Sequence, residues 1–65
     1  MDKDVRQLVK AAARQGFEAV PHGAHVRVTN KRTGEWTTLA KTPSDYRWRK
    51  NAIANLRRMG FNPHR

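Results

Sequence analysis

The sequence has no cysteine, few acidic residues and no long hydrophobic run. Without cysteine the chain can form neither a disulfide nor a thiolate-bound zinc site, and an intracellular, cytoplasmic location fits this absence. The chain also has no long apolar segment and no signal-peptide pattern, so we expect neither membrane insertion nor secretion. Its 65 residues are enough for one small domain, predicted to span residues 1–65.

The scarcity of acids leaves a strongly basic chain. Lysine and arginine number 14 against five aspartates and glutamates, for a formal net charge of +9. A cation of this density binds phosphate backbones through the release of counterions, so a nucleic acid is the expected partner. Two alternatives stay open, namely a solvated basic surface and a surface for an acidic protein. The sequence contains no glycine-rich phosphate loop and no Ser-His-Asp pattern.

Two segments are predicted to be amphipathic helices. In residues 2–15, apolar residues recur at i, i+3, i+4 and i+7, and Gly16 is placed to end the helix. The second helix is predicted to begin at Pro43, with Thr42 as its cap, and to end at Met59. Its predicted inward residues are Tyr46, Ala52, Ile53, Leu56 and Met59. Residues 60–65 are predicted to form a flexible tail, in which Phe61 is available to dock.

The segment between the helices has the period of two that is typical of strands. We expect strands at residues 17–20, 24–29 and 35–39, with a turn before residue 24 and another at residues 30–34. In the second strand, His25 and Arg27 share one face with Thr29. The facing of Trp36 stays open, because either Trp36 or its neighbours can point inward. The predicted fold class is α+β, a single domain of order α-β-β-β-α with two helices packed on one face of a three-stranded antiparallel sheet.

Basic residues crowd the predicted second helix. Five residues on its surface are candidate phosphate and sugar contacts, together with the neighbouring Trp48: Arg47, Lys50, Asn51, Arg57 and Arg58. Arg49 falls in the inward stripe, so we expect its guanidinium to reach solvent or to pair with Asp45. The alternative for this surface is a solvated basic face.

His25 is the candidate for chemistry. An imidazole can take a proton from a ribose 2′-OH or return one to a leaving 5′-oxygen, so one histidine can cleave RNA without a metal or a cofactor. Arg27 is placed to stabilise charge on the phosphate, and Trp36 and His22 are accessory candidates. We expect no metal site, because His22 and His25 lack further ligands nearby in the sequence. The alternative for His25 is a solvated strand residue without a function.

The order of these motifs resembles that of the HicA-like toxins, which are small mRNA interferases with a double-stranded-RNA-binding-domain-like fold. The segment "LVKAAARQGFEAV" resembles the family's opening helix and first strand, "GAHVRV" its Gly-Ser-His strand and "LRRMGF" its closing helix end. The segment "TPSDYRWRKN" is similar to that of actinobacterial and phage members. Two positions depart from the family: Ala24 replaces its usual serine and Val26 a common second histidine, which removes two polar neighbours of His25.

The resemblance implies that His25 holds the position of the catalytic histidine, that the substrate is RNA and that a cognate antitoxin protein covers the site. Whether the chain is an enzyme stays open at this point, because a non-catalytic nucleic-acid-binding module of the same fold has the same charge and element order. An adaptor for an acidic protein is the third alternative.

Overall fold

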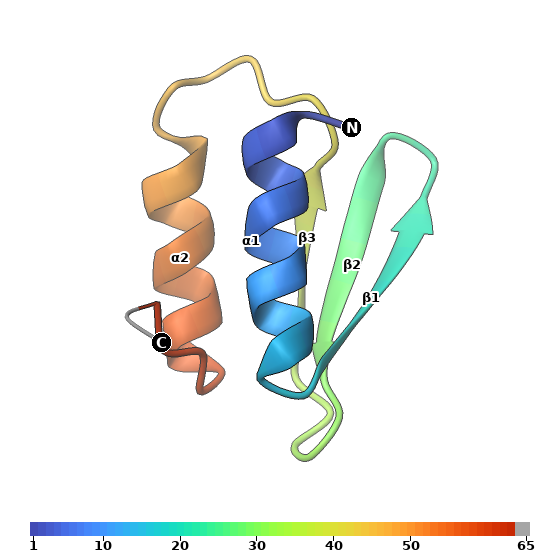
Figure 1. Cartoon of the computed structure of the whole chain (residues 1–65), viewed down its shortest axis with the longest axis vertical. Helices are drawn as coiled ribbons and strands as arrows, with labels where there is room; N and C mark the ends of the chain where they lie inside the picture. The colour runs from blue at the N-terminus through green and yellow to red at the C-terminus, as the bar shows by residue number, and fades with distance from the viewer. Residues whose placement is uncertain (64–65) are drawn as a thin grey trace.

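The computed structural model describes residues 1–63 and has the predicted element order α-β-β-β-α. In chain order, the elements are α1 (Lys3–Arg14), β1 (Phe17–His22), β2 (His25–Asn30), β3 (Trp36–Ala40) and α2 (Trp48–Arg58), as Figure 1 shows. The three strands form one antiparallel sheet in the order β1-β2-β3. The predicted α+β fold class is therefore confirmed. Residues 64–65, the end of the predicted tail, lie outside the described residues.

Helix α1 follows its predicted pattern closely. The carboxylate of Asp2 caps it by accepting a hydrogen bond from the Asp4 N–H at 2.8 Å, which satisfies one of the free amides of the first turn. Val5, Leu8 and Ala12 are buried along one face. The chain leaves the helix through Gly16, whose φ of +92° is a conformation that other residues rarely adopt.

The first hairpin is longer and tighter than the sequence predicted. Strand β1 does not end at residue 20 but continues through Pro21 to His22, because β1 is an edge strand and a proline on the outer side of an edge costs no ladder hydrogen bond. Only Gly23 and Ala24 connect β1 to β2, so Ala24 belongs to the turn and not to the strand. Gly23 has a φ of +57° and Ala24 has a negative φ, the combination found in type II′ hairpin turns.

Helix α2 differs from its prediction at its start. It begins at Trp48 rather than Pro43, because the turn is organised by Asp45, whose carboxylate accepts a hydrogen bond from the Arg47 N–H at 2.9 Å. The later start rotates the apolar stripe. Trp48 replaces Tyr46, which is 89% exposed. Ala52, Leu56 and Met59 are buried as predicted, whereas Ile53 is half-buried at the margin of the core.

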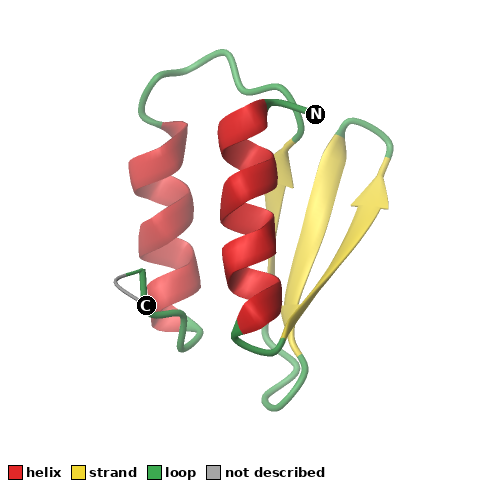
Figure 2. Cartoon of the chain, in the orientation of Figure 1, coloured by secondary structure: helices red, strands yellow, loops and turns green. Residues whose placement is uncertain are grey.

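Both helices pack on the same face of the sheet (Figures 1 and 2). Val26, Val28 and Leu39 point from the sheet into a single core that also holds Leu8 and Ala12 of α1 and the buried residues of α2. The other face of the sheet carries no helix. Within residues 1–63, no helix is both long and apolar enough to cross a bilayer.

Two polar links and one aromatic pair fasten the end of α2 to the rest of the domain. The buried Asn30 side chain donates a hydrogen bond from Nδ2 to the Met59 carbonyl at 2.6 Å. Phe61 is buried and packs edge-on against Phe17, with ring centroids 6.2 Å apart. Gln15 then exchanges hydrogen bonds with the Asn62 backbone in both directions, at 2.7 and 2.8 Å. Phe61 therefore docks, as the sequence allowed.

Candidate nucleic-acid interface

The face of the sheet away from the helices, called the open face below, carries most of the strand residues that the sequence singled out. Residues directly opposite each other in an antiparallel pair point to the same face, so the register assigns the side chains. The open face consists of Glu18, Val20 and His22 on β1, His25, Arg27 and Thr29 on β2, and Trp36, Thr38 and Ala40 on β3. The predicted common facing of His25, Arg27 and Thr29 is confirmed.

Trp36 lies on the open face, which resolves the alternative that the sequence left undecided. Its side is opposite to that of Leu39, which is buried, and Trp36 itself remains 55% exposed. The Arg27 guanidinium stacks over the indole with its central carbon 4.1 Å from the ring centroid. Arg27 pairs with Thr38 in the register, so it reaches Trp36 across the diagonal of the ladder. This cation–π contact holds a cation and an aromatic surface together on an exposed sheet.

Arg27 is not saturated with hydrogen bonds. Its Nε is buried against the indole and has no hydrogen-bond partner within the described residues. A guanidinium has five N–H donors in a planar fork, a shape that suits phosphate oxygens. Trp36 orients this arginine by stacking, and no carboxylate of residues 1–63 forms an ion pair with it.

His25 stands at the hairpin end of the open face. It is the first residue of β2 and is exposed, and its partner across the ladder is His22, also exposed. The two-residue turn between them thus places both imidazoles side by side on one face. The sequence predicted His22 in a turn, so the pairing with His25 was not foreseen.

His25 and Trp36 lie at opposite ends of the open face. Ala40 is the residue opposite His25, and Trp36 precedes Ala40 by four residues. With a rise of about 3.3 Å per residue, the two side chains are separated by roughly 13 Å along the strands. Successive phosphates of a stacked strand are about 3.4 Å apart along the helix axis, so more than one nucleotide is needed to reach from Trp36 to His25.

The candidate contacts on α2 lie on the other side of the domain. Arg47, Lys50, Asn51, Arg57 and Arg58, called the α2 cationic surface below, are all exposed as predicted. Because α2 packs on the face of the sheet opposite to the open face, these residues do not surround His25 (Figure 2). The structure therefore divides the predicted contacts into two groups.

Some members of the α2 cationic surface already have partners. Arg47 lies 3.7 Å from the Asp45 carboxylate, and its guanidinium is 5.9 Å from the Tyr46 ring centroid. Asp45 pairs with Arg47, and Arg49 is exposed, so the structure shows the first of the two outcomes expected for Arg49, a guanidinium that reaches solvent. Trp48, an accessory candidate, is half-buried and packs against the core. That packing leaves Trp48 little surface for an external ligand.

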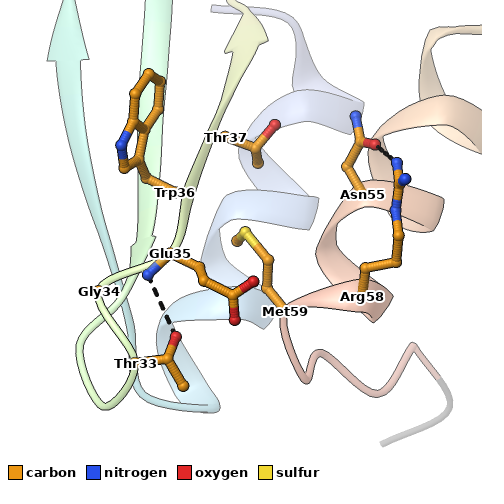
Figure 3. A pocket seen from close by; sticks show the side chains of 8 residues that line it. All are labelled: Thr33, Gly34, Glu35, Trp36, Thr37, Asn55, Arg58 and Met59. Carbon is orange, nitrogen blue, oxygen red and sulfur yellow. Dashed lines mark hydrogen bonds between the residues drawn. The ribbon is translucent and has the colours of Figure 1, made fainter.

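A groove at the edge of β3 connects the two groups. Thr33, Gly34, Glu35, Trp36, Thr37, Asn55, Arg58 and Met59 line it, and its volume is about 630 Å³. Figure 3 shows the Trp36 ring directed away from Asn55, while the Glu35 carboxylate points toward Met59. The Arg58 guanidinium donates a hydrogen bond to the Asn55 side-chain oxygen. One residue of the open face and one of the α2 cationic surface thus border the same groove, called the β3-edge groove below.

Sequence reasoning missed the β3-edge groove because its residues come from a turn, a strand and a distant helix. Glu35, Thr37 and Asn55 form no motif in the sequence that would associate them. Within residues 1–63, no group of three or more histidines, cysteines, aspartates and glutamates is placed to hold a metal ion. No protein-family model matches the sequence, and neither the curated proteins nor the solved structures contain a match.

Proposed function

We propose that this chain is a cytoplasmic RNA-binding protein that cleaves single-stranded RNA without a metal ion, using His25. The observation that carries the proposal is the composition of the open face. An exposed imidazole, an arginine without a carboxylate partner and an exposed indole share one face of the sheet. The net charge of +9 supports a polyanionic substrate.

Each of the three side chains has a role that its chemistry permits. His25 exchanges the proton of the ribose 2′-OH or of the leaving 5′-oxygen. Arg27, whose guanidinium lies over Trp36 and away from His25, offers N–H donors to a neighbouring phosphate of the bound strand and not to the one at which His25 acts. Trp36 stacks on a base one or more nucleotides away, an interaction that every base can make. The stacking of a base on Trp36 favours structureless RNA as the substrate, because a base inside a duplex cannot reach the indole.

The proposed class is a HicA-like toxin. Support comes from the motif order in the sequence, from the α-β-β-β-α order of the elements and from the exposed position of His25 on β2. A toxin of this kind requires an inhibitor, so the proposed partner is a cognate antitoxin that covers the open face. An acidic segment of such a partner complements Arg27, which forms no ion pair within residues 1–63.

A non-catalytic RNA-binding module is the second candidate function. The specific observation in its favour is the separation of the α2 cationic surface from His25, because a helix with exposed cations can hold a phosphate backbone by itself. The β3-edge groove reconciles the two candidates if RNA passes from Arg58 around the edge to Trp36.

The two candidates differ in a simple assay. Purified protein and its His25→Ala variant are incubated with structureless RNA in excess chelator, and both are compared for RNA binding. The catalytic proposal expects cleavage by the unaltered protein only, with similar binding by both. Binding without cleavage by either protein supports the module, and equal cleavage by both excludes His25 as the cause.

A further inference from the structure

We propose that His22 is a second catalytic residue, which works with His25 as an acid–base pair on one phosphodiester. This inference rests on the proposed ribonuclease function and adds a residue and a mechanism to it. The observation that carries it is the register of the first hairpin, in which His22 and His25 are directly opposite each other. Both side chains are exposed on the open face.

The hairpin holds the two imidazoles at a short separation. Directly opposite residues of an antiparallel ladder have their Cβ atoms about 5 Å apart. The two-residue turn at Gly23 and Ala24 closes the hairpin immediately beyond this pair, and a turn of fixed length sets the register of the two strands. Because each imidazole can rotate about two side-chain bonds, the ring nitrogens can lie on two sides of one phosphate group.

Pro21 and Val26 support this arrangement from behind. They form the next pair of the ladder and point to the other face, where Val26 is buried. Proline also fixes the backbone φ of the residue just before His22. The histidine pair therefore belongs to the paired strands of the hairpin and not to a loop.

Cleavage of RNA needs a base for the 2′-OH and an acid for the leaving 5′-oxygen, and two histidines supply one of each. The imidazole that acts as base takes the proton of the 2′-OH, and the 2′-oxygen forms a bond to phosphorus. The bond from phosphorus to the 5′-oxygen breaks, and the second imidazole, in its protonated form, gives its proton to that oxygen. The products are a 2′,3′-cyclic phosphate and a 5′-hydroxyl, and one proton has moved from each donor to each acceptor.

Few other charged groups share the open face with the pair. Arg27 on β2 and Glu18 on β1 are the others, and β3 contributes only Trp36, Thr38 and Ala40. Lys41 follows β3 and donates its backbone N–H to the Ala24 carbonyl at 2.9 Å, which places its backbone beside the turn. Proton transfer at this end of the face therefore depends on the two histidines, with Arg27 as the nearest cation on β2.

The test compares His22→Gln and His25→Gln on two substrates in excess chelator. The first is an ordinary RNA dinucleotide, and the second is a nucleoside 3′-phosphodiester with a nitrophenyl leaving group, which departs without a proton. On the ordinary substrate we expect each variant to lose about 100-fold or more in rate. On the activated substrate we expect the variant that lacks the acid to recover most of its rate, and the variant that lacks the base to stay slow.

The pH profile gives an independent readout. The unaltered protein is expected to cleave with a rate that falls on both sides of an optimum, and each variant is expected to lose one of the two limbs. We expect both glutamine variants to unfold like the unaltered protein, because both positions are exposed. Matching unfolding curves exclude loss of structure as the cause of a lower rate.

The outcomes distinguish this inference from the proposed function. If the unaltered protein cleaves, His25→Gln is inactive and His22→Gln keeps the full rate, the acid–base pair is wrong and the ribonuclease proposal stands. If both variants are equally slow on both substrates, the pair is also wrong, because neither histidine acts as the acid. If the unaltered protein cleaves neither these substrates nor a longer structureless RNA, both proposals are overturned.

Discussion

The guanidinium of Arg27 lies 4.1 Å from the centroid of the Trp36 ring, on the face of the sheet that no helix covers. The two residues sit on neighbouring strands at diagonal positions, so the contact depends on the strand register and on no other element. Their stack covers one side of the indole and leaves Trp36 55% exposed. This relationship makes the open face a surface that both stacks and carries positive charge.

Replacement of Trp36 by alanine is expected to weaken the binding of single-stranded RNA by about tenfold, because stacking of one base on an aromatic ring contributes about 1–3 kcal/mol. Tyr46→Ala is the matched control, since Tyr46 is 89% exposed and lies at the helix side of the domain. Fluorescence anisotropy with a labelled oligonucleotide measures both affinities. If Tyr46→Ala lowers the affinity for RNA more than Trp36→Ala does, RNA does not bind at the open face and the account is contradicted.

The cations of α2 are expected to contribute unequally. Arg58 borders the β3-edge groove together with Trp36, whereas Arg47 already has a carboxylate partner in Asp45 at 3.7 Å. We therefore expect Arg58→Gln to lower the slope of log affinity against log salt by about 1, and Arg47→Gln to change it less. Titrations at several salt concentrations give the slopes. Equal slopes for Arg58→Gln and the unaltered protein would show that Arg58 contacts no phosphate and that RNA does not bind in the β3-edge groove.

The apolar face of α2, which includes Trp48 in place of Tyr46, leads to a prediction about the free energy of unfolding. Leu56 is completely buried, so Leu56→Ala is expected to lower the free energy of unfolding by about 2–5 kcal/mol. Ile53→Ala is expected to cost less, because Ile53 is half-buried, and Tyr46→Ala is expected to cost almost nothing. Denaturant unfolding followed by circular dichroism gives the three values. If Tyr46→Ala lowers the free energy of unfolding as much as Leu56→Ala, Tyr46 belongs to the buried face of the helix, as the sequence predicted, and this account of α2 is wrong.

Asn30 is expected to be a stabilising polar residue of the core. Its Nδ2 donates to the Met59 carbonyl at 2.6 Å and its Oδ1 accepts from the Arg32 N–H at 2.9 Å, so one side chain joins α2 to the turn between β2 and β3. We expect Asn30→Ala to cost about 2 kcal/mol, since it leaves a buried carbonyl without its partner.

Asn51→Ala, an exposed change on α2, serves as its control and is expected to leave the free energy of unfolding within about 0.5 kcal/mol. Thermal or denaturant unfolding measures both variants. If the two substitutions cost the same, the link between Asn30 and Met59 contributes nothing to stability.

The elements of the fold were largely predictable because their signals are local. The period of Val5, Leu8 and Ala12 and the glycine that follows them predict α1 to within one residue at each end, and alternation in β2 predicts its two faces. The start of α2 was not predictable in the same way. Thr42 and Pro43 form a strong local start signal, but Asp45 organises the turn, and the tertiary placement of Trp48 in the core decides the phase of the helix.

The candidate site was only partly predictable, because its geometry depends on pairing between strands. His25, Arg27 and their common face follow from alternation within one strand. The pairing of His22 with His25 requires the length of the turn, and the contact of Arg27 with Trp36 requires the register of a second ladder. The first is local to residues 22–25 but depends on where the turn falls, whereas the second joins two strands. The separation of the α2 cationic surface from His25 appears only when the helices are placed on the sheet.

The most direct test of the account is the rate of RNA cleavage by the unaltered protein and by His25→Gln, in excess chelator, with the product ends identified by mass spectrometry. The account predicts a 2′,3′-cyclic phosphate and a 5′-hydroxyl from the unaltered protein, and a rate at least about 100-fold lower for the variant. Cleavage at the same rate by both proteins, or no cleavage of any structureless RNA by the unaltered protein, would contradict it.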